Sequence, residues 1–176
     1  MKTLKKIGIG FAALIALLLL IALFVKKEYT VERQVTINRP VADVFNYVKN
    51  IKNQDYYSKW NMADPAKKTT SKGTDGTVGF VYGWNGNDEA GEGEQEITSI
   101  TENRKIETKL RFKRPMESTA QAYMVTRPAA SGGTVVTWGM HGESAYPMNL
   151  MNFMLDGMLG DDMAESLASL KANLEK

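Results

Sequence analysis

The chain of 176 residues contains no cysteine and only one histidine, His141. Without cysteine there can be no disulfide, no thiolate nucleophile, no iron–sulfur cluster and no lipid anchor on a cysteine. A single histidine excludes zinc sites of the two- or three-histidine type. The glycine-flanked serine of hydrolase elbows, G-x-S-x-G, is also missing. The sequence therefore predicts no catalytic residue, no metal and no cofactor.

Acidic residues are missing from the first 27 positions, which hold five of the 22 Lys and Arg. Residues 28–176 carry 17 basic and 20 acidic residues, so that the net charge of this part is −3. A nucleic-acid binder carries a clustered basic surface, and the nearest such cluster is Lys109, Arg111, Lys113 and Arg114. On a strand, alternate members of that cluster share one face, as is ordinary for a solvated face. We therefore expect no nucleic-acid partner.

Residues 7–25 contain no charged or strongly polar side chain. As a helix this run is about 28 Å long, close to the thickness of a bilayer core. It is longer than the apolar core of a signal peptide, and no Ala-x-Ala cleavage pattern follows it. We predict a single-pass membrane anchor over residues 1–27 and one ligand-binding domain over 28–176. A cleaved signal and a buried core helix are the alternatives.

Lysines at positions 2, 5 and 6 precede the apolar run, whereas Lys26 and Lys27 follow it beside Glu28. The positive-inside tendency therefore favours a cytoplasmic amino terminus and an exported domain at a membrane surface.

The domain opens with a period-2 pattern over 28–38, typical of a strand with one buried side, in which Arg33 interrupts the apolar face. Pro40 then introduces a helical spacing over 41–51, and residues 52–76 are polar, with a short strand predicted near 66–71. Strands follow at 77–85, 91–102, 104–113, 116–127 and 132–143. After Pro147 the apolar period becomes helical up to Leu174, with Gly157 and Gly160 as points of bending. This order predicts an α+β domain.

Two polar features resemble a catalytic pair and a calcium-binding loop, and each has a simpler interpretation. His141 and Glu143 share one strand face and could pair as a base and its orienting group, or form an ordinary strand-end pair. The acidic segment 85–96 has partial EF-hand spacing, but Ala90 stands where the sharp turn needs glycine. We interpret that segment as a connecting loop.

Three segments carry a family resemblance: VERQVTINRPVADVFNYV (31–48), WNGNDEAGEGEQEITSI (84–100) and GGTVVTWGM (132–140). Together with the amphipathic last helix, they resemble the START-like (SRPBCC) superfamily. More narrowly they resemble its polyketide cyclase/dehydrase and lipid-transport members. The resemblance implies a helix-grip fold, in which a curved seven-stranded antiparallel sheet wraps a long C-terminal helix around a hydrophobic cavity. Relatives bind diverse lipophiles, so the resemblance specifies no ligand.

Bulky apolar residues at inferred inward positions are the candidate cavity lining, and methionine adapts to varied apolar shapes. A solid core is the alternative interpretation. The candidate ligand-binding residues are Trp60, Tyr82, Trp84, Phe112, Trp138, Met140, Met151, Met154 and Met158.

The leading hypothesis is membrane-tethered binding or carriage of a hydrophobic small molecule or lipid. The alternatives are a polyketide cyclase- or hydrolase-like enzyme, and a ligand-free interaction module of the envelope. The sequence does not specify the oligomeric state.

Overall fold

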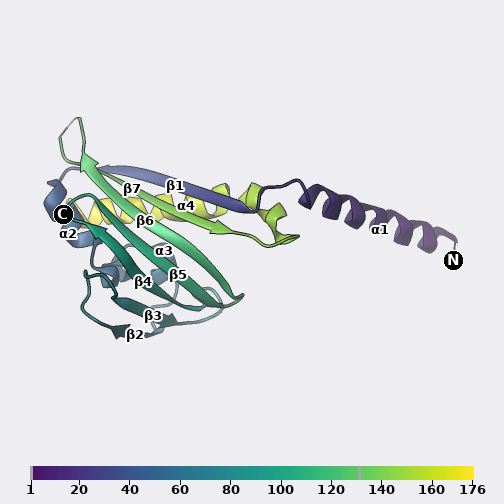
Figure 1. The fold of residues 1–176 in the computed structure, drawn as a ribbon, viewed down its shortest axis with the longest axis horizontal. Coiled ribbons are helices and arrows are strands. Elements are labelled where there is room, and N and C mark those ends of the chain that lie inside the picture. Colours follow the sequence, from purple (N-terminus) through teal and green to yellow (C-terminus); the bar gives the residue numbers. More distant parts are fainter. Residues whose placement is uncertain (1, 131) are drawn as a thin grey trace.

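Seven antiparallel strands form a single sheet in the computed structural model, which describes residues 2–130 and 132–176 (Figure 1). The order across the sheet is β1-β7-β6-β5-β4-β3-β2, so the first strand pairs with the last. The strands are β1 (Glu28–Ile37), β2 (Lys68–Lys72), β3 (Val81–Asn85), β4 (Glu92–Thr101), β5 (Lys105–Arg114), β6 (Ser118–Pro128) and β7 (Thr134–Glu143).

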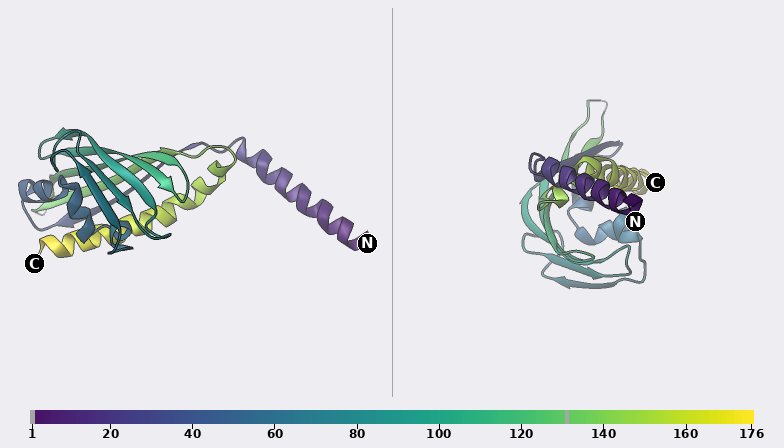
Figure 2. Two further views of the ribbon diagram at one scale, coloured as in Figure 1. Left: turned by 90° about the horizontal axis from the view of Figure 1, so that it is seen from below. Right: turned by 90° about the vertical axis from the view of Figure 1, so that its right-hand side faces the viewer.

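One face of the curved sheet is covered by helices, of which α4 is the longest (Figure 2). This confirms the predicted α+β helix-grip fold. The helices are α1 (Lys2–Ala22), α2 (Val41–Val48), α3 (Lys59–Met62) and α4 (Asn152–Leu174), with 3-10 turns η1 (Ile51–Tyr56) and η2 (Met148–Met151).

The core lies between the inward face of the sheet and one face each of α2 and α4. Val44, Phe45 and Val48 of α2 are buried, as helical spacing places them on one side. Met163, Leu167 and Leu170 give α4 the same kind of apolar stripe. This stripe begins only at Met163, so the second part of α4 contributes large buried side chains to the core and the first part does not.

Arg33, which interrupts the apolar face of β1, points towards α4. Its guanidinium donates to the Asp156 carboxylate (Nη1 to Oδ1, 3.0 Å) and to the Asp156 carbonyl oxygen (Nη2 to O, 2.8 Å). A Cβ atom at Gly160 would lie only 1.9 Å from Arg33 Nη2, so glycine makes room for this contact. Arg33 lowers the pKa of the Asp156 carboxyl through this hydrogen bond and its charge. The helix α4 runs unbroken through Gly157 and Gly160.

Several element boundaries differ from the sequence-based prediction. The stretch 52–76 contains most of η1, and α3 as well as β2. Helical segments this short have no period that a sequence pattern could reveal. The strand predicted from residue 77 begins at Val81. Gly79 has a φ of +87°, which a strand does not allow, and Val78 before it is exposed. The predicted strands at 116 and 132 begin two residues later, at Ser118 and Thr134.

Helix α1 extends away from the sheet, and its described side chains are exposed except at Ala22 (Figures 1 and 2). The segment Thr3–Ala22 has a mean hydropathy of 2.2 and is long enough to cross a membrane. A signal sequence meets the same criteria of length and composition.

Candidate ligand-binding cavity

A cavity of about 220 Å³ lies between the inward face of the sheet, the segment 54–67 and the first half of α4. Its walls are mostly apolar. The residues that line it are Gln54, Ser58, Trp60, Asn61, Lys67, Tyr82, Trp84, Glu89, Ala90, Gly91, Gln95, Leu110, Phe112, Arg114, Pro115, Ala122, Trp138, Met140 and Leu159.

Five aromatic side chains contribute to this lining. Trp60 and Trp138 meet edge to face with their ring centroids 5.6 Å apart, and Trp84 meets Phe112 in the same way at 6.0 Å. Such pairs hold rings in fixed positions as well as burying them. The three tryptophans of the chain therefore all border the cavity.

Strand alternation and two hydrogen bonds position these rings. Tyr82 and Trp84 stand two residues apart on β3 and therefore point to the same side of the sheet. The Trp84 indole donates to the Ala90 carbonyl oxygen (3.1 Å), and its ring crosses Gly93, where a Cβ would come within 2.7 Å. On the opposite wall, the Trp60 indole donates to Asp162 Oδ2 of α4 (3.1 Å).

A polar cluster around Asp55 forms one side of the cavity. Asp55 accepts hydrogen bonds from the Tyr82 hydroxyl (2.7 Å) and the Asn61 amide (3.0 Å), and lies 3.0 Å from the Lys67 ammonium. The Lys67 side chain is only 7% exposed, and its ammonium also donates to the Asn61 carbonyl oxygen. Burial, and then the hydrogen bond to Asp55, raise the pKa of Tyr82 well above its usual value. The members of this cluster thus satisfy one another.

Further polar groups are distributed along the wall. Gln95 is buried on β4 and donates to the Thr108 hydroxyl (3.1 Å). The Ser58 hydroxyl is buried and has no hydrogen-bond partner among the described residues. A buried hydroxyl of this kind is uncommon in folded proteins.

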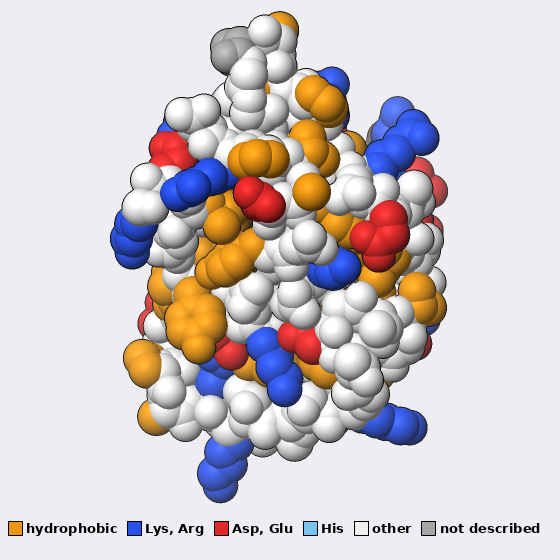
Figure 3. All heavy atoms as spheres, turned by 90° about the vertical axis from the view of Figure 1, so that its left-hand side faces the viewer, with side chains coloured by type: hydrophobic (Ala, Val, Ile, Leu, Met, Phe, Trp, Pro, Cys, Tyr) orange, Lys and Arg blue, Asp and Glu red, His pale blue; other side chains and the backbone are white. Residues whose placement is uncertain are grey.

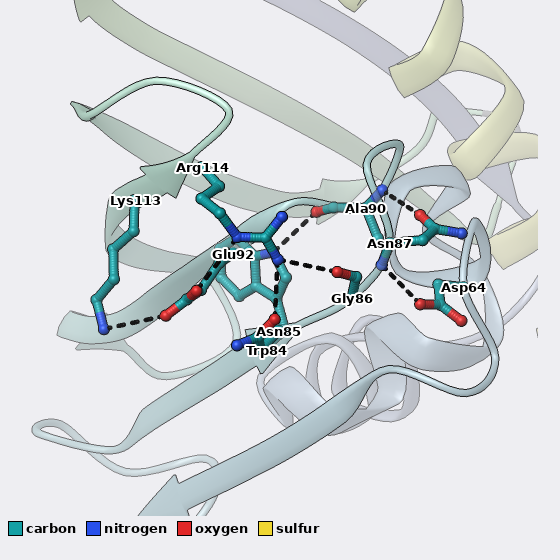
Figure 4. A network of polar contacts seen from close by, with 9 residues as sticks. All are labelled: Asp64, Trp84, Asn85, Gly86, Asn87, Ala90, Glu92, Lys113 and Arg114. Atoms are coloured by element: carbon teal, nitrogen blue, oxygen red, sulfur yellow. Dashed lines mark hydrogen bonds and ion pairs between the residues drawn. The ribbon is translucent and has the colours of Figure 1, made fainter.

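The connection between β3 and β4 borders one end of the cavity, which we call its mouth, together with Arg114 and Pro115. Polar contacts hold this connection in place (Figure 4). Arg114 of β5 donates to the Asn85 side chain and to the Gly86 carbonyl oxygen, both at 2.9 Å, and pairs with Glu92 at 3.4 Å. The Asn87 backbone amide donates to Asp64 Oδ2 at 2.8 Å. The carboxylates of Glu92 and Asp64 therefore help to hold this loop.

The predicted aromatic residues and Met140 all line the cavity, but the three helix methionines do not. Met154 and Met158 are 62% and 54% exposed, and Met151 borders a separate open hollow beside Tyr29. Leu159 is the residue of α4 that reaches the cavity. Helical spacing identifies which residues share a face, but not where the helix crosses the sheet.

His141 does not contribute to the cavity. It follows Met140, whose side chain points inward, so His141 lies on the outer face of β7 and its Nδ1 is 3.0 Å from the Thr30 hydroxyl. A hydrogen bond or ion pair with Glu143, one of the two interpretations of this pair, is not among the contacts of His141 in the described residues.

Polar lining residues were missed by the sequence analysis. Gln95 could have been found, because it occupies an inward position between Gly93 and Ile97 on β4. Lys67 and Asn61 lie outside regular strands, where no period signals which way a side chain points.

Comparisons with known proteins agree with this architecture. The model of the family described as polyketide cyclase / dehydrase and lipid transport matches residues 28–175. A solved protein from Nitrosospira multiformis has a TM-score of 0.62 at 18% identity, over 82% of this chain and 95% of that one. The protein CV1439 from Chromobacterium violaceum has a TM-score of 0.59 at 12% identity, over 84% and 97%.

A third similar structure is the di-domain ARO/CYC StfQ from the steffimycin biosynthetic pathway, with a TM-score of 0.62 at 13% identity. The match covers 84% of this chain and 51% of StfQ. No curated protein matches the sequence. At these identities the structural likeness establishes the fold.

Proposed function

The chain belongs to the polyketide cyclase / dehydrase and lipid transport family, and we propose that it binds a compact hydrophobic molecule while tethered to a membrane. The observation that carries this proposal is the partly open cavity with its mostly apolar wall of aromatic rings. Concave sites lined by aromatic side chains, with a few polar groups, are the usual form of small-molecule sites.

The size of the cavity favours a small ligand over a phospholipid. A volume of about 220 Å³ is below the roughly 300–1,000 Å³ of sites for drug-sized molecules. A molecule of two or three fused rings fills such a space, whereas two acyl chains exceed it. Binding would be driven by removing apolar ligand surface from water, at about 25 cal/mol per Å².

Tethering is supported by the apolar helix α1. Its length and hydropathy suit a bilayer span, and the segment from Leu23 to Lys27 is all that separates it from β1. The three lysines before the apolar run favour a cytoplasmic amino terminus, which would place residues 28–176 outside the cytoplasm. A lipophilic ligand partitions into the bilayer, so a tethered binder meets it at a raised local concentration.

Catalysis is the second candidate, and the Asp55 cluster is the observation that raises it. Tyr82 and Lys67 both line the cavity and are both titratable. However, the Tyr82 hydroxyl donates to Asp55, and the raised pKa of Tyr82 keeps it protonated at neutral pH. Lys67 is likewise paired with Asp55 and donates to the Asn61 carbonyl oxygen, so both groups are already engaged with other protein groups. Binding and carriage of a ligand is therefore a simpler function for this lining than catalysis.

Tryptophan fluorescence offers a direct test of ligand binding, since Trp60, Trp84 and Trp138 all border the cavity. We expect 1-aminoanthracene, titrated into the full chain in a mild detergent, to quench tryptophan emission and to gain blue-shifted emission of its own. For a ligand of this size the dissociation constant should be about 1–100 µM. Binding should saturate at one molecule per chain. Free tryptophan in the same detergent is the control, and an equal, non-saturating response there and in the protein would contradict the proposal.

A further inference from the structure

Exposed apolar side chains concentrate at one end of the domain. Of the ten large hydrophobic residues that are exposed among the described residues of 28–176, seven lie in the turn after β5 or in 146–158. We call these seven residues the apolar tip: Met116, Tyr146, Met148, Met151, Phe153, Met154 and Met158. Phe153 is 74% exposed and Met154 is 62% exposed. Transfer of such side chains from water to an apolar medium lowers the free energy.

The apolar tip adjoins the end of α1 through specific hydrogen bonds. Asn149, a buried residue of η2, donates from its side-chain amide to the carbonyl oxygens of Ala22 (2.7 Å) and Val25 (2.8 Å). Asn152 donates in the same way to those of Lys26 (2.9 Å) and Lys27 (3.0 Å). The bond to Ala22 caps a carbonyl group of the last turn of α1, and the other three hold the segment that leads from α1 to β1. Residues 149–152 are thereby fixed beside the point where α1 ends.

The mouth of the cavity faces the same end of the molecule. In the antiparallel register, Glu28 pairs with Glu143, Phe112 with Ser118, and Glu92 with Arg114, so β1 begins where β5 and β7 end. The loop 89–91 and Pro115, which border the mouth, follow from these strand ends. Met116 of the tip is the next residue after Pro115. Figure 1 shows these strand ends, η2 and α1 together at one side.

The opposite end of the domain has a different character. Figure 3 views that end, where Lys and Arg side chains project from the rim and hydrophobic side chains are interspersed with polar and charged ones. The turn between β4 and β5, including Glu102, lies there, because β4 runs away from the cavity mouth. The asymmetry between the two ends distinguishes the tip from scattered surface apolar residues.

We propose that the apolar tip inserts into the surface of the bilayer that holds α1, so that the cavity mouth opens onto the lipid and the ligand passes directly between them. This rests on the membrane tether of the proposed function. The bilayer is the occupant because Tyr146 of the tip donates to the Leu19 carbonyl oxygen of α1 (3.3 Å), and Asn149, between tip residues, donates to that of Ala22. Exposed Phe and Met side chains are suited to the boundary between headgroups and acyl chains.

Depth-dependent quenching in vesicles tests the insertion. Because the chain has no cysteine, Phe153→Cys and Met154→Cys variants of the full chain can each carry one NBD fluorophore. Glu102→Cys at the opposite end is the matched control, and Leu14→Cys within α1 reports the anchor itself. The vesicles consist of phosphatidylcholine and phosphatidylglycerol, with or without phosphatidylcholine that carries a nitroxide on its acyl chain.

We expect the nitroxide lipid to quench NBD at positions 14, 153 and 154 several times more strongly than at position 102. Quenching at 14 without quenching at 153 and 154 would overturn the inserted tip and leave the tether intact. Absence of quenching at all four positions would refute the tether itself. Iodide, a quencher confined to the aqueous phase, is added in a second measurement. Protection of positions 153 and 154 from both the nitroxide lipid and iodide would show that protein covers the tip, as in a dimer, and would also overturn the proposal.

Transfer of a ligand from vesicles tests the second part of the proposal. The double variant Phe153→Asp/Met154→Asp should take up 1-aminoanthracene from vesicles severalfold more slowly than the unmodified chain, while its affinity in detergent stays the same. Met62→Asp, at an exposed methionine outside the tip, is the control. Equal transfer rates for all three proteins would contradict direct passage, whether or not the cavity binds the probe.

Discussion

Replacing Leu159 by Trp should reduce the affinity for 1-aminoanthracene by about 70-fold or more. Leu159 is the residue of α4 that borders the cavity, so the larger indole would occupy space that the ligand needs. Losing about 100 Å² of buried apolar ligand surface, at about 25 cal/mol per Å², costs about 2.5 kcal/mol, which corresponds to that factor. The measurement is a titration followed by the emission of the probe, since the variant adds a tryptophan.

Met158→Trp is the matched control, because it adds the same side chain one residue earlier on α4, where Met158 is 54% exposed and outside the cavity. We expect the affinity of this control to stay within a factor of two or three of the unmodified chain, as for most surface changes. Thermal unfolding of both variants separates loss of the site from loss of the fold. Equal affinity in a folded Leu159→Trp protein would show that the ligand binds elsewhere.

Replacing Asp55 by Ala should lower the free energy of unfolding by about 3 kcal/mol. The change removes the acceptor of Tyr82 and Asn61 and leaves the Lys67 ammonium, whose side chain is only 7% exposed, without its carboxylate. Removing one partner of a buried ion pair costs about 3–5 kcal/mol, and the 30% exposure of Asp55 places the effect near the lower limit. Urea unfolding of the full chain in detergent, followed by tryptophan emission, reports on this domain.

Two further variants show whether the stranded charge is the cause. In Asp55→Ala/Lys67→Met an apolar side chain replaces the ammonium, so most of the lost stability should return. Glu165→Ala removes an exposed partner of Lys59 and should change the unfolding free energy by less than about 1 kcal/mol. If Asp55→Ala were no more destabilising than Glu165→Ala, the cluster would not hold this wall of the cavity.

The sequence predicted the architecture well because its apolar periods are regular. Alternation marked the strands, and Arg33 was recognised as an exception on β1; the structure explains it by the contact with Asp156 and the missing side chain at Gly160. The short turns η1 and α3 were not predicted, because six and four residues are too few to show a period.

The residues that line the cavity were predicted in part for a related reason, whereas their binding of a ligand stays a prediction. Tyr82, Trp84, Phe112 and Trp138 lie on strands, where alternate residues must face the same way, and they border the cavity as expected. The three helix methionines were predicted to line the cavity and do not. Helical spacing shows which residues share a face, but not which face of the helix meets the sheet. The first turns of α4 carry the apolar tip, whereas its inward stripe begins further along the chain.

The most direct test of the central claim is native mass spectrometry of the full chain, purified in detergent from the cells that produce it. We expect a species heavier than the bare chain by one small hydrophobic molecule. This species should persist in Met158→Trp and disappear in Leu159→Trp. A spectrum with only the bare chain, which also gains no mass on addition of 1-aminoanthracene, would contradict the claim that the cavity is a ligand-binding site.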